Sequence, residues 1–125
     1  MDNFTLVRPE HLNHHGYLFG GMMLKWVDEN AWMAATRDYP GCKFVTISMD
    51  ACRFKQPVEN GAILRYHMEE TEHGKTSLTY QVTVLADEPG ANSEKEVFST
   101  QVTFVRLDEN GTPCDLPAKT NKSIL

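Results

Sequence analysis

Apolar and polar residues follow two different periods along this chain, one before residue 40 and another after it. Residues 21–37 contain no proline and no glycine beyond the first position, and almost all of them are good helix formers. Four residues spaced three or four positions apart lie on one face of this segment: Leu24, Asp28, Ala31 and Ala35. This face is apolar except for the carboxylate of Asp28. The pattern predicts one long helix, apolar over most of its circumference, that other elements must cover.

Beyond the helix, apolar positions alternate with polar ones, which is typical of strands with one buried face. Together with a short apolar start, this alternation predicts five strands: Phe4–Val7, Phe44–Phe54, Ala62–Thr71, Thr76–Leu85 and Glu96–Leu107. Segments of turn composition follow the longer strands: 56–61, 72–74, 87–93 and 108–113. Consecutive strands joined by short turns predict an antiparallel meander, whose apolar face the helix must cover.

The length of the chain fits one domain. With 125 residues it can bury roughly two thirds of its unfolded surface. One nearly all-apolar helix held by a curved antiparallel sheet of five to six strands is the α+β arrangement called the hotdog fold, and residues 1–125 are expected to form it as a single domain. The tail from about Cys114 is rich in proline, lysine, asparagine and serine, which predicts an irregular structure.

The chain is acidic, with a net charge of −5, which argues against a general affinity for nucleic acid or for anionic membranes. Its three cysteines are odd in number and lack metal-like spacing, so we expect reduced structural thiols and a cytoplasmic location. The N-terminus has no basic region followed by an apolar run, and no stretch approaches the ~18 apolar residues of a membrane span. The chain is therefore expected to be soluble and untargeted.

Asp28 is the first candidate for chemistry, because a carboxylate within an apolar helix must find partners or take up a proton. The pair Gly20–Gly21 stands at the expected helix start, where unpaired N–H groups and the helix dipole favour a developing negative charge. Glycine also lets a substrate approach the backbone closely. The alternative interpretations are a hydrogen-bonded structural acid and a tight helix entry.

The segment 13–28 combines several fixed positions with an acid at one spacing: Asn13, Gly16, Phe19, Gly20, Gly21 and Asp28. This pattern resembles the acyl-CoA thioesterase branch of the hotdog superfamily. Further matches lie at residues 45–50 and 54–58, at Gly61, and at residues 74–77, 103–105 and 108–111. The resemblance extends over about residues 8–117, and its first motif is the most specific one.

The resemblance implies hydrolysis of a fatty or short acyl-CoA thioester to free acid and coenzyme A, without a metal or an organic cofactor. Asp28 would activate water or attack the thioester carbonyl itself, and the resemblance leaves both roles open. Asn13 would help to hold the thioester and the water, and the Gly21 amide would polarise the carbonyl oxygen, with Gly20 beside it in the binding site. A plain turn is the alternative role for Asn13.

The helical distance between Gly21 and Asp28 predicts the assembly. Seven residues of helix span about 10 Å, whereas a reacting carbon needs its oxyanion donor and its acid each about 3 Å away. The missing partner is therefore expected from a second copy, in a two-fold homodimer with two shared sites. The resemblance implies the same arrangement, often with dimers assembled further, and a hexamer built as a trimer of dimers is one such assembly.

A second candidate binding segment precedes the strand at residues 76–85. It consists of Gly74, Lys75, Thr76 and Ser77. An ammonium, exposed amides and hydroxyls would bind the phosphates of coenzyme A, and an ordinary hairpin turn is the alternative.

Two further groups of side chains have ordinary structural interpretations. A histidine cluster precedes the helix: His11, His14 and His15. It does not predict a metal site, because no Cys or Asp at suitable spacing completes a ligand set. Large apolar side chains on the helix fit an acyl tunnel or, more often, the core: Met22, Met23, Trp26 and Trp32.

Two other functions remain open from the residues alone. A hotdog hydratase or dehydratase would pair a loop histidine, His14 or His15, with the helix acid Asp28. A non-catalytic acyl-CoA sensor would bind its ligand at the same site to switch assembly or a partner, although the retained acid argues against it. Neither a Gly-x-Ser-x-Gly turn nor a matched set of Cys, His and Asn indicates a serine or cysteine nucleophile.

Overall fold

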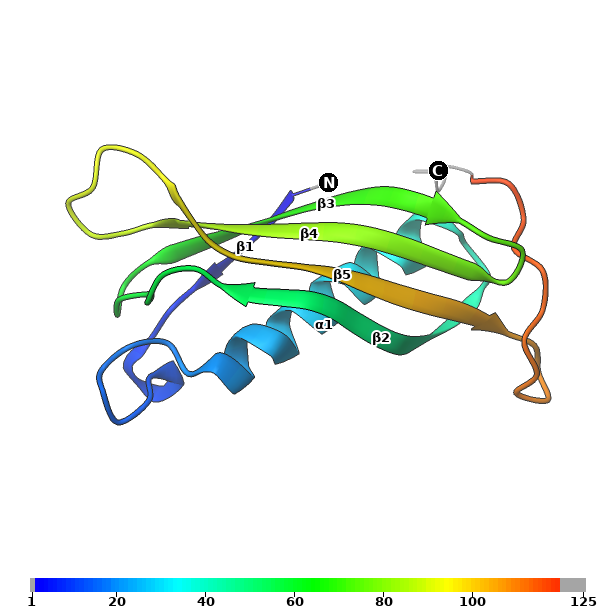
Figure 1. Ribbon diagram of the computed structural model, residues 1–125, viewed down its shortest axis with the longest axis horizontal. Helices are drawn as coiled ribbons and strands as arrows, with labels where there is room; N and C mark the ends of the chain where they lie inside the picture. Colours follow the sequence, from blue (N-terminus) through cyan, green and yellow to red (C-terminus); the bar gives the residue numbers. More distant parts are fainter. Residues whose placement is uncertain (1, 120–125) are drawn as a thin grey trace.

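The computed structural model describes residues 2–119 and packs a single long helix against an antiparallel sheet (Figure 1). Its elements are β1 (Asp2–Leu6), the short 3₁₀ helix η1 (Pro9–His11), α1 (Gly20–Asp38), β2 (Lys43–Phe54), β3 (Ile63–His73), β4 (Ser77–Asp87) and β5 (Lys95–Leu107). The predicted helix and all five predicted strands are confirmed, with bounds shifted by only a few residues. Residues 114–119 of the predicted irregular tail contain no helix or strand, and its remainder, 120–125, lies outside the described residues.

The order of the strands corrects the expected meander. The sheet runs β1-β3-β4-β5-β2, so only β3, β4 and β5 form consecutive hairpins, whereas β2 pairs with β5. The connection 55–62 does not turn back as a hairpin because hydrogen bonds hold it to the N-terminal segment. Leu18 N–H donates to the Val58 carbonyl and Gly61 N–H to the Val7 carbonyl, each at 2.9 Å. As a result, β1 and β2 are the two edges of the sheet.

The helix rests on the sheet through small and medium apolar side chains: Met23, Val27, Ala31, Ala34 and Ala35. The same core contains large, fully buried side chains of the strands: Leu64, Tyr66, Tyr80, Phe98 and Phe104. Alanines on the helix leave room for these rings, so the interface packs densely. On the opposite flank Trp32 and Met33 remain 43% and 40% exposed. Within one chain the sheet therefore covers only one side of the apolar helix.

Polar contacts fix one end of this arrangement. Near the C-terminal end of α1, the Tyr39 hydroxyl donates to Glu70, and the Tyr80 hydroxyl donates to Asp38 Oδ2 at 2.7 Å. Burial is the main cause that raises the pKa of both tyrosines far above the ordinary range, so the hydroxyls stay protonated donors.

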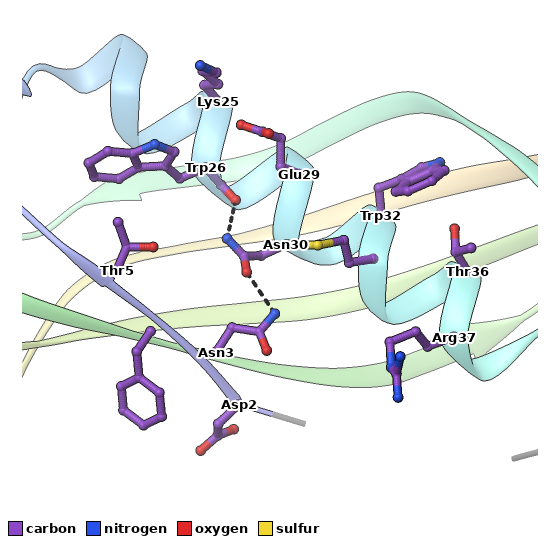
Figure 2. Close-up of a pocket in the computed structure, with 12 residues that line it drawn as sticks. Asp2, Asn3, Thr5, Lys25, Trp26, Glu29, Asn30, Trp32, Thr36 and Arg37 are labelled. Atoms are coloured by element: carbon purple, nitrogen blue, oxygen red, sulfur yellow. Dashed lines mark hydrogen bonds between the residues drawn. The ribbon is translucent and has the colours of Figure 1, made fainter. Parts of the chain in front are cut away.

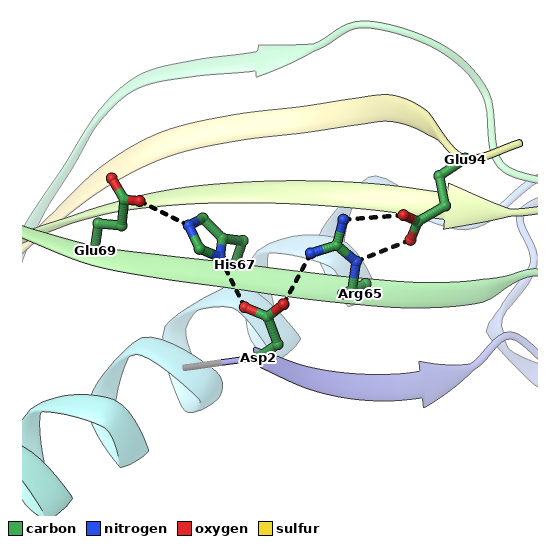
Figure 3. A network of polar contacts seen from close by, with 5 residues as sticks. All are labelled: Asp2, Arg65, His67, Glu69 and Glu94. Atoms are coloured by element: carbon green, nitrogen blue, oxygen red, sulfur yellow. Dashed lines mark hydrogen bonds and ion pairs between the residues drawn. The ribbon is translucent and has the colours of Figure 1, made fainter.

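A second polar network holds β1 to β3 on the outer face of the sheet (Figure 3). Arg65 donates to Asp2 at 2.8 Å and makes a two-pronged contact with Glu94 at 2.9 Å. His67 bridges Asp2 and Glu69 at 2.7 and 2.8 Å. These hydrogen bonds lower the pKa of Asp2 and raise that of His67, so both groups favour their charged forms.

Candidate active site

The loop before α1 is organised by Asn13. Its side-chain Oδ1 accepts hydrogen bonds from the N–H groups of His15 at 2.9 Å and Tyr17 at 3.2 Å, and its own N–H donates to the Tyr17 carbonyl at 2.7 Å. Within residues 2–119, the Asn13 side-chain N–H₂ group has no hydrogen-bond partner. The turn role and the binding role considered for Asn13 are therefore compatible, because the oxygen serves the turn and the amide nitrogen is left to donate.

The first turn of α1 leaves two amides unpaired, as the sequence predicted. The N–H groups of Met22 and Met23 donate to the Phe19 carbonyl at 3.0 and 3.2 Å, but those of Gly20 and Gly21 have no partner in the described part of the chain. A Cβ built on Gly21 would stand 2.5 Å from Cε2 of Phe19, so the ring lies against this glycine. Gly21 thus combines a free donor with a position that admits no larger residue unless the ring moves.

Asn13 and Gly20 line the same pocket, of about 670 Å³, at the start of the helix. Its floor is apolar and consists of side chains that are at most 8% exposed: Leu18, Met23, Val58 and Val97. His15, Tyr17, Phe54 and the segment 55–57 complete the lining. The structure therefore brings two of the predicted site residues together beside an apolar surface. Met23 belongs to the hydrophobic core and also lines this pocket.

Asp28 lies on the flank of α1 that faces β2 and is half-buried rather than enclosed. The Thr46 hydroxyl donates to Asp28 Oδ1 at 2.7 Å. This contact gives the carboxylate a fixed orientation and leaves Oδ2 without a partner among residues 2–119. The sequence predicts that Asp28 lies deep among apolar neighbours. The sheet ends at β2, however, so Asp28 lies at the edge of the sheet and is only half-buried.

Thr46 is the functional candidate that the sequence interpretation missed. The sequence places Thr46 at a polar position of an alternating strand, within the matched segment 45–50, and gives it no role of its own. The available signal was its spacing of two from Phe44, a buried residue, which places both side chains on the helix side of β2. A hydroxyl on that side faces the only carboxylate of the apolar stripe.

The structure does not bring Asp28 and Gly21 to one point within a single chain. Asp28 lines a separate hollow of about 290 Å³ with Glu29, Trp32, Met33 and Thr46. This hollow and the pocket at Asn13 share no lining residue.

The segment Gly74–Ser77 forms the turn between β3 and β4, at the opposite end of the sheet from the helix start (Figure 1). Gly74 N–H donates to the Ser77 carbonyl at 2.8 Å, and the Lys75 carbonyl accepts from Leu116 N–H at 2.8 Å. The Lys75 side chain is exposed. Thr76 also joins the turn to the chain beyond it, since its carbonyl accepts a hydrogen bond from β5 at 3.0 Å. Within one chain these four residues stand apart from the rest of the predicted site.

The histidines that precede the helix have structural contacts. His11 Nδ1 accepts from Arg8 N–H at 3.0 Å, and its ring packs edge-on against Trp26. The rings of His14 and His15 contact each other at an angle of 43°, with ring centres 3.9 Å apart. No group of three His, Cys, Asp or Glu side chains in residues 2–119 is placed to hold a metal ion. All three cysteines are free thiols. No helix in the same part of the chain is long and apolar enough to cross a membrane.

One long helix that lies across a five-stranded antiparallel sheet is the architecture of the hotdog fold. The model of the thioesterase superfamily matches residues 15–92. The chain belongs to this superfamily.

Solved structures and curated proteins agree with this assignment. A hexameric hotdog-fold thioesterase of Campylobacter jejuni is 32% identical, with a TM-score of 0.82 over 92% of this chain and 88% of that one. An acyl-CoA hydrolase of Staphylococcus aureus, in complex with butyryl-CoA, CoA and CoA disulfide, is 31% identical, with a TM-score of 0.85 over 94% of this chain and 71% of that one. These likenesses confirm the predicted hotdog fold.

Among curated proteins, the cytosolic acyl coenzyme A thioester hydrolase of Rattus norvegicus is 33% identical over 116 residues. The match covers 90% of this chain but 30% of that protein. The chain thus spans about a third of the length of the mammalian relative, which has further segments outside the match.

Proposed function

We propose that this chain hydrolyses acyl-CoA thioesters to a free acid and coenzyme A. The observation that carries the proposal is the Asp28 carboxylate, held by Thr46 on the helix flank, in a chain whose helix start also offers unpaired amides. An acid and an oxyanion donor are the two groups that acyl transfer to water requires.

The proposed chemistry uses the free oxygen of Asp28. As a general base, Oδ2 takes a proton from water while the hydroxide attacks the thioester carbon, and the Gly21 N–H binds the oxygen that becomes negative. The carbon–sulfur bond then breaks, and the thiolate of coenzyme A leaves with a proton. As a nucleophile, Asp28 would attack the carbon itself, break the carbon–sulfur bond, release the thiolate of coenzyme A and form an anhydride. Water would then hydrolyse the anhydride to the free acid and restore the Asp28 carboxylate, and a proton of that water would go to the thiolate. Thr46 would orient the carboxylate in either case.

We propose further that each site is shared between two chains. The separate hollows of Asp28 and Asn13 and the helical distance of about 10 Å from Gly21 support this arrangement. The edge strand β2 carries Ile47 and Phe54, which are 58% and 56% exposed. Two-fold pairing of β2 edges would cover these side chains and bring the Asp28 hollow of one chain to the Asn13 pocket of its partner.

The relatives support the same proposal. The S. aureus acyl-CoA hydrolase has been solved with alanine in place of an asparagine, an aspartate or a threonine. Its asparagine and aspartate lie fifteen positions apart, as Asn13 and Asp28 do. The C. jejuni and Yersinia pestis thioesterases are hexamers, which supports a further assembly of dimers here. The name of the rat relative supports a cytoplasmic location.

Release of free thiol from acyl-CoA tests the function directly. Asp28→Asn is nearly isosteric, so acyl-CoA should still bind while turnover falls by about 100-fold or more, the scale expected for loss of a general base. Retention of most of the turnover would exclude Asp28 from the chemical step. Hydration of enoyl-CoA without thiol release would instead indicate a hydratase, for which His15 lines the Asn13 pocket. Tight binding without thiol release over hours would indicate a sensor.

Subunit mixing tests the shared site. Chains with Asn13→Ala and chains with Asp28→Ala should each be nearly inactive alone. In a mixed dimer one site carries both lesions and the other carries neither. Random pairing makes about half of the dimers mixed, so activity should recover to about a quarter of the wild-type value. If mass spectrometry confirms subunit exchange and no activity returns, both groups come from the same chain.

A further inference from the structure

An open groove with a volume of about 1050 Å³ lies between α1 and β1 (Figure 2). It contains no residue of the predicted site. Four large apolar side chains line it: Phe4, Trp26, Trp32 and Met33. Lys25 and Arg37 stand at its rim, exposed to solvent.

The groove is continuous with the hollow of the catalytic candidate. Glu29, Trp32 and Met33 line both the groove and the hollow of Asp28. A path therefore leads from the carboxylate over the exposed flank of α1 to β1. The helix from Trp26 to Arg37 gives the groove a length of about 16 Å.

Two polar side chains of the groove, Asn3 and Asn30, are hydrogen-bonded, whereas the Thr36 hydroxyl in the same lining has no partner among the described residues. The Asn30 side-chain amide donates to the Trp26 carbonyl at 2.8 Å, and its Oδ1 accepts from the Asn3 side-chain amide at 2.7 Å (Figure 2). An apolar ligand that covers Asn3 and Asn30 leaves neither amide without a partner, so covering these two side chains incurs little of the usual cost of burying polar groups.

From this continuity we infer that the groove binds the acyl chain of the thioester and that the enzyme prefers medium and long unbranched acyl groups to short ones. The inference rests on the proposed hydrolase function. If the thioester carbon lies at Asp28, the acyl chain that extends from this carbon first meets the apolar side chains of Trp32 and Met33. A fully buried methylene favours binding about fourfold, and an open groove that shields half of it gives roughly twofold per methylene.

Tryptophan fluorescence measures occupation of the groove without any turnover. The chain has two tryptophans, Trp26 and Trp32, and both line the groove. Trp32→Phe leaves Trp26, which lies outside the Asp28 hollow, as the sole reporter. The probe is the thioether S-decyl-CoA, which cannot be hydrolysed. We expect a saturable blue shift of Trp26 emission with S-decyl-CoA and no shift with CoA.

Other occupants give different results. A shift of the same size with CoA alone would place the nucleotide in the groove and overturn the inference. A spectrum that changes on protein dilution but not with S-decyl-CoA would mean that a second copy covers the groove, which also overturns it.

Chain-length kinetics give the second test. Met33→Gln keeps the size of an exposed side chain but removes its apolar surface, so kcat/KM for decanoyl-CoA relative to butyryl-CoA should fall at least about fivefold. Ile63→Gln is the matched control, since Ile63 is an exposed apolar residue on β3 outside the groove, and the ratio should not change.

The two failures are distinguishable. If the wild-type chain releases thiol from both substrates and Met33→Gln leaves the ratio unchanged, the acyl groove is excluded and the hydrolase stands. If the wild-type chain releases no thiol from either substrate, the hydrolase proposal fails, and the acyl-chain assignment that rests on it falls too.

Discussion

The substitution Gly21→Ala should change turnover strongly but the stability of the fold only slightly. Gly21→Ala adds a methyl group 2.5 Å from Phe19 Cε2 and 3.1 Å from Cζ. The Phe19 side chain is 54% exposed, so its ring can rotate away. Alanine is better than glycine in a helix by about 1 kcal/mol, which offsets the lost ring contact. The free energy of unfolding should therefore change by less than about 1 kcal/mol.

Activity should respond differently to the same methyl group. The added carbon and the displaced ring stand beside the unpaired Gly21 N–H, where the thioester oxygen is proposed to bind. Loss of one oxyanion donor costs about 100-fold or more in turnover, and partial obstruction should approach that value. Urea denaturation and thiol release, measured on the same preparation, give the two quantities.

Gly90→Ala is the control with the opposite expectation. Gly90 lies in the loop between β4 and β5 at φ +78°, with no atom within 4 Å of a built Cβ. Alanine in this left-handed conformation costs about 1–2 kcal/mol, so stability should fall while turnover is kept. Normal turnover in Gly21→Ala would refute the role of its amide. If Gly21→Ala lowers the free energy of unfolding by more than about 3 kcal/mol, the Phe19 ring cannot move away from the added methyl group.

Three further measurements test other parts of the molecule. The pKa of His67 is raised above its ordinary 6.5 by two flanking carboxylates, chiefly Glu69, so its contribution to stability is complete below that pH and is lost as pH rises through the folded value. His67→Gln should lower the free energy of unfolding more at about pH 5.5 than at about pH 8.5, by less than about 1 kcal/mol because the site is exposed. Tm at the two pH values follows this change, and an equal loss at both would contradict the charge effect. Tyr80→Phe removes the donor to Asp38 and should cost about 1–3 kcal/mol in urea denaturation, and no loss would show that water replaces the hydroxyl. Lys75→Ala should raise KM for acyl-CoA more than for a short pantetheine thioester, and equal effects would exclude phosphate recognition.

The accuracy of the sequence predictions follows from how local each signal is. The helix and the strands depend on periods that neighbouring residues carry, and they were located to within a few positions. The pairing of β2 with β5 was missed because it joins residues far apart in the sequence, such as Val45 with Val105. Hydrogen bonds from the connection 55–62 to the N-terminal segment decide that pairing, and no local pattern encodes them.

The same distinction applies to the site. The free amides of Gly20 and Gly21 were predictable, since the first turn of any helix lacks partners for its N–H groups. The Thr46 hydroxyl was not identified because its contact with Asp28 depends on where the helix crosses the edge of the sheet. The acyl groove likewise depends on the placement of β1 beside α1, which only the tertiary fold defines.

A helix that is apolar over most of its circumference has a specific meaning in a single-sheet fold. The sheet buries one flank through residues such as Val27 and Ala31, and it cannot also cover Trp32 and Met33 on the other side. Exposed apolar surface of this kind next to a carboxylate requires a second component, either another chain or a substrate. Here the proposed dimer would cover β2 and the Asp28 hollow, and the groove beyond Trp32 would be left for the acyl chain. A sequence in which that flank were polar would keep the fold but lose the binding surface.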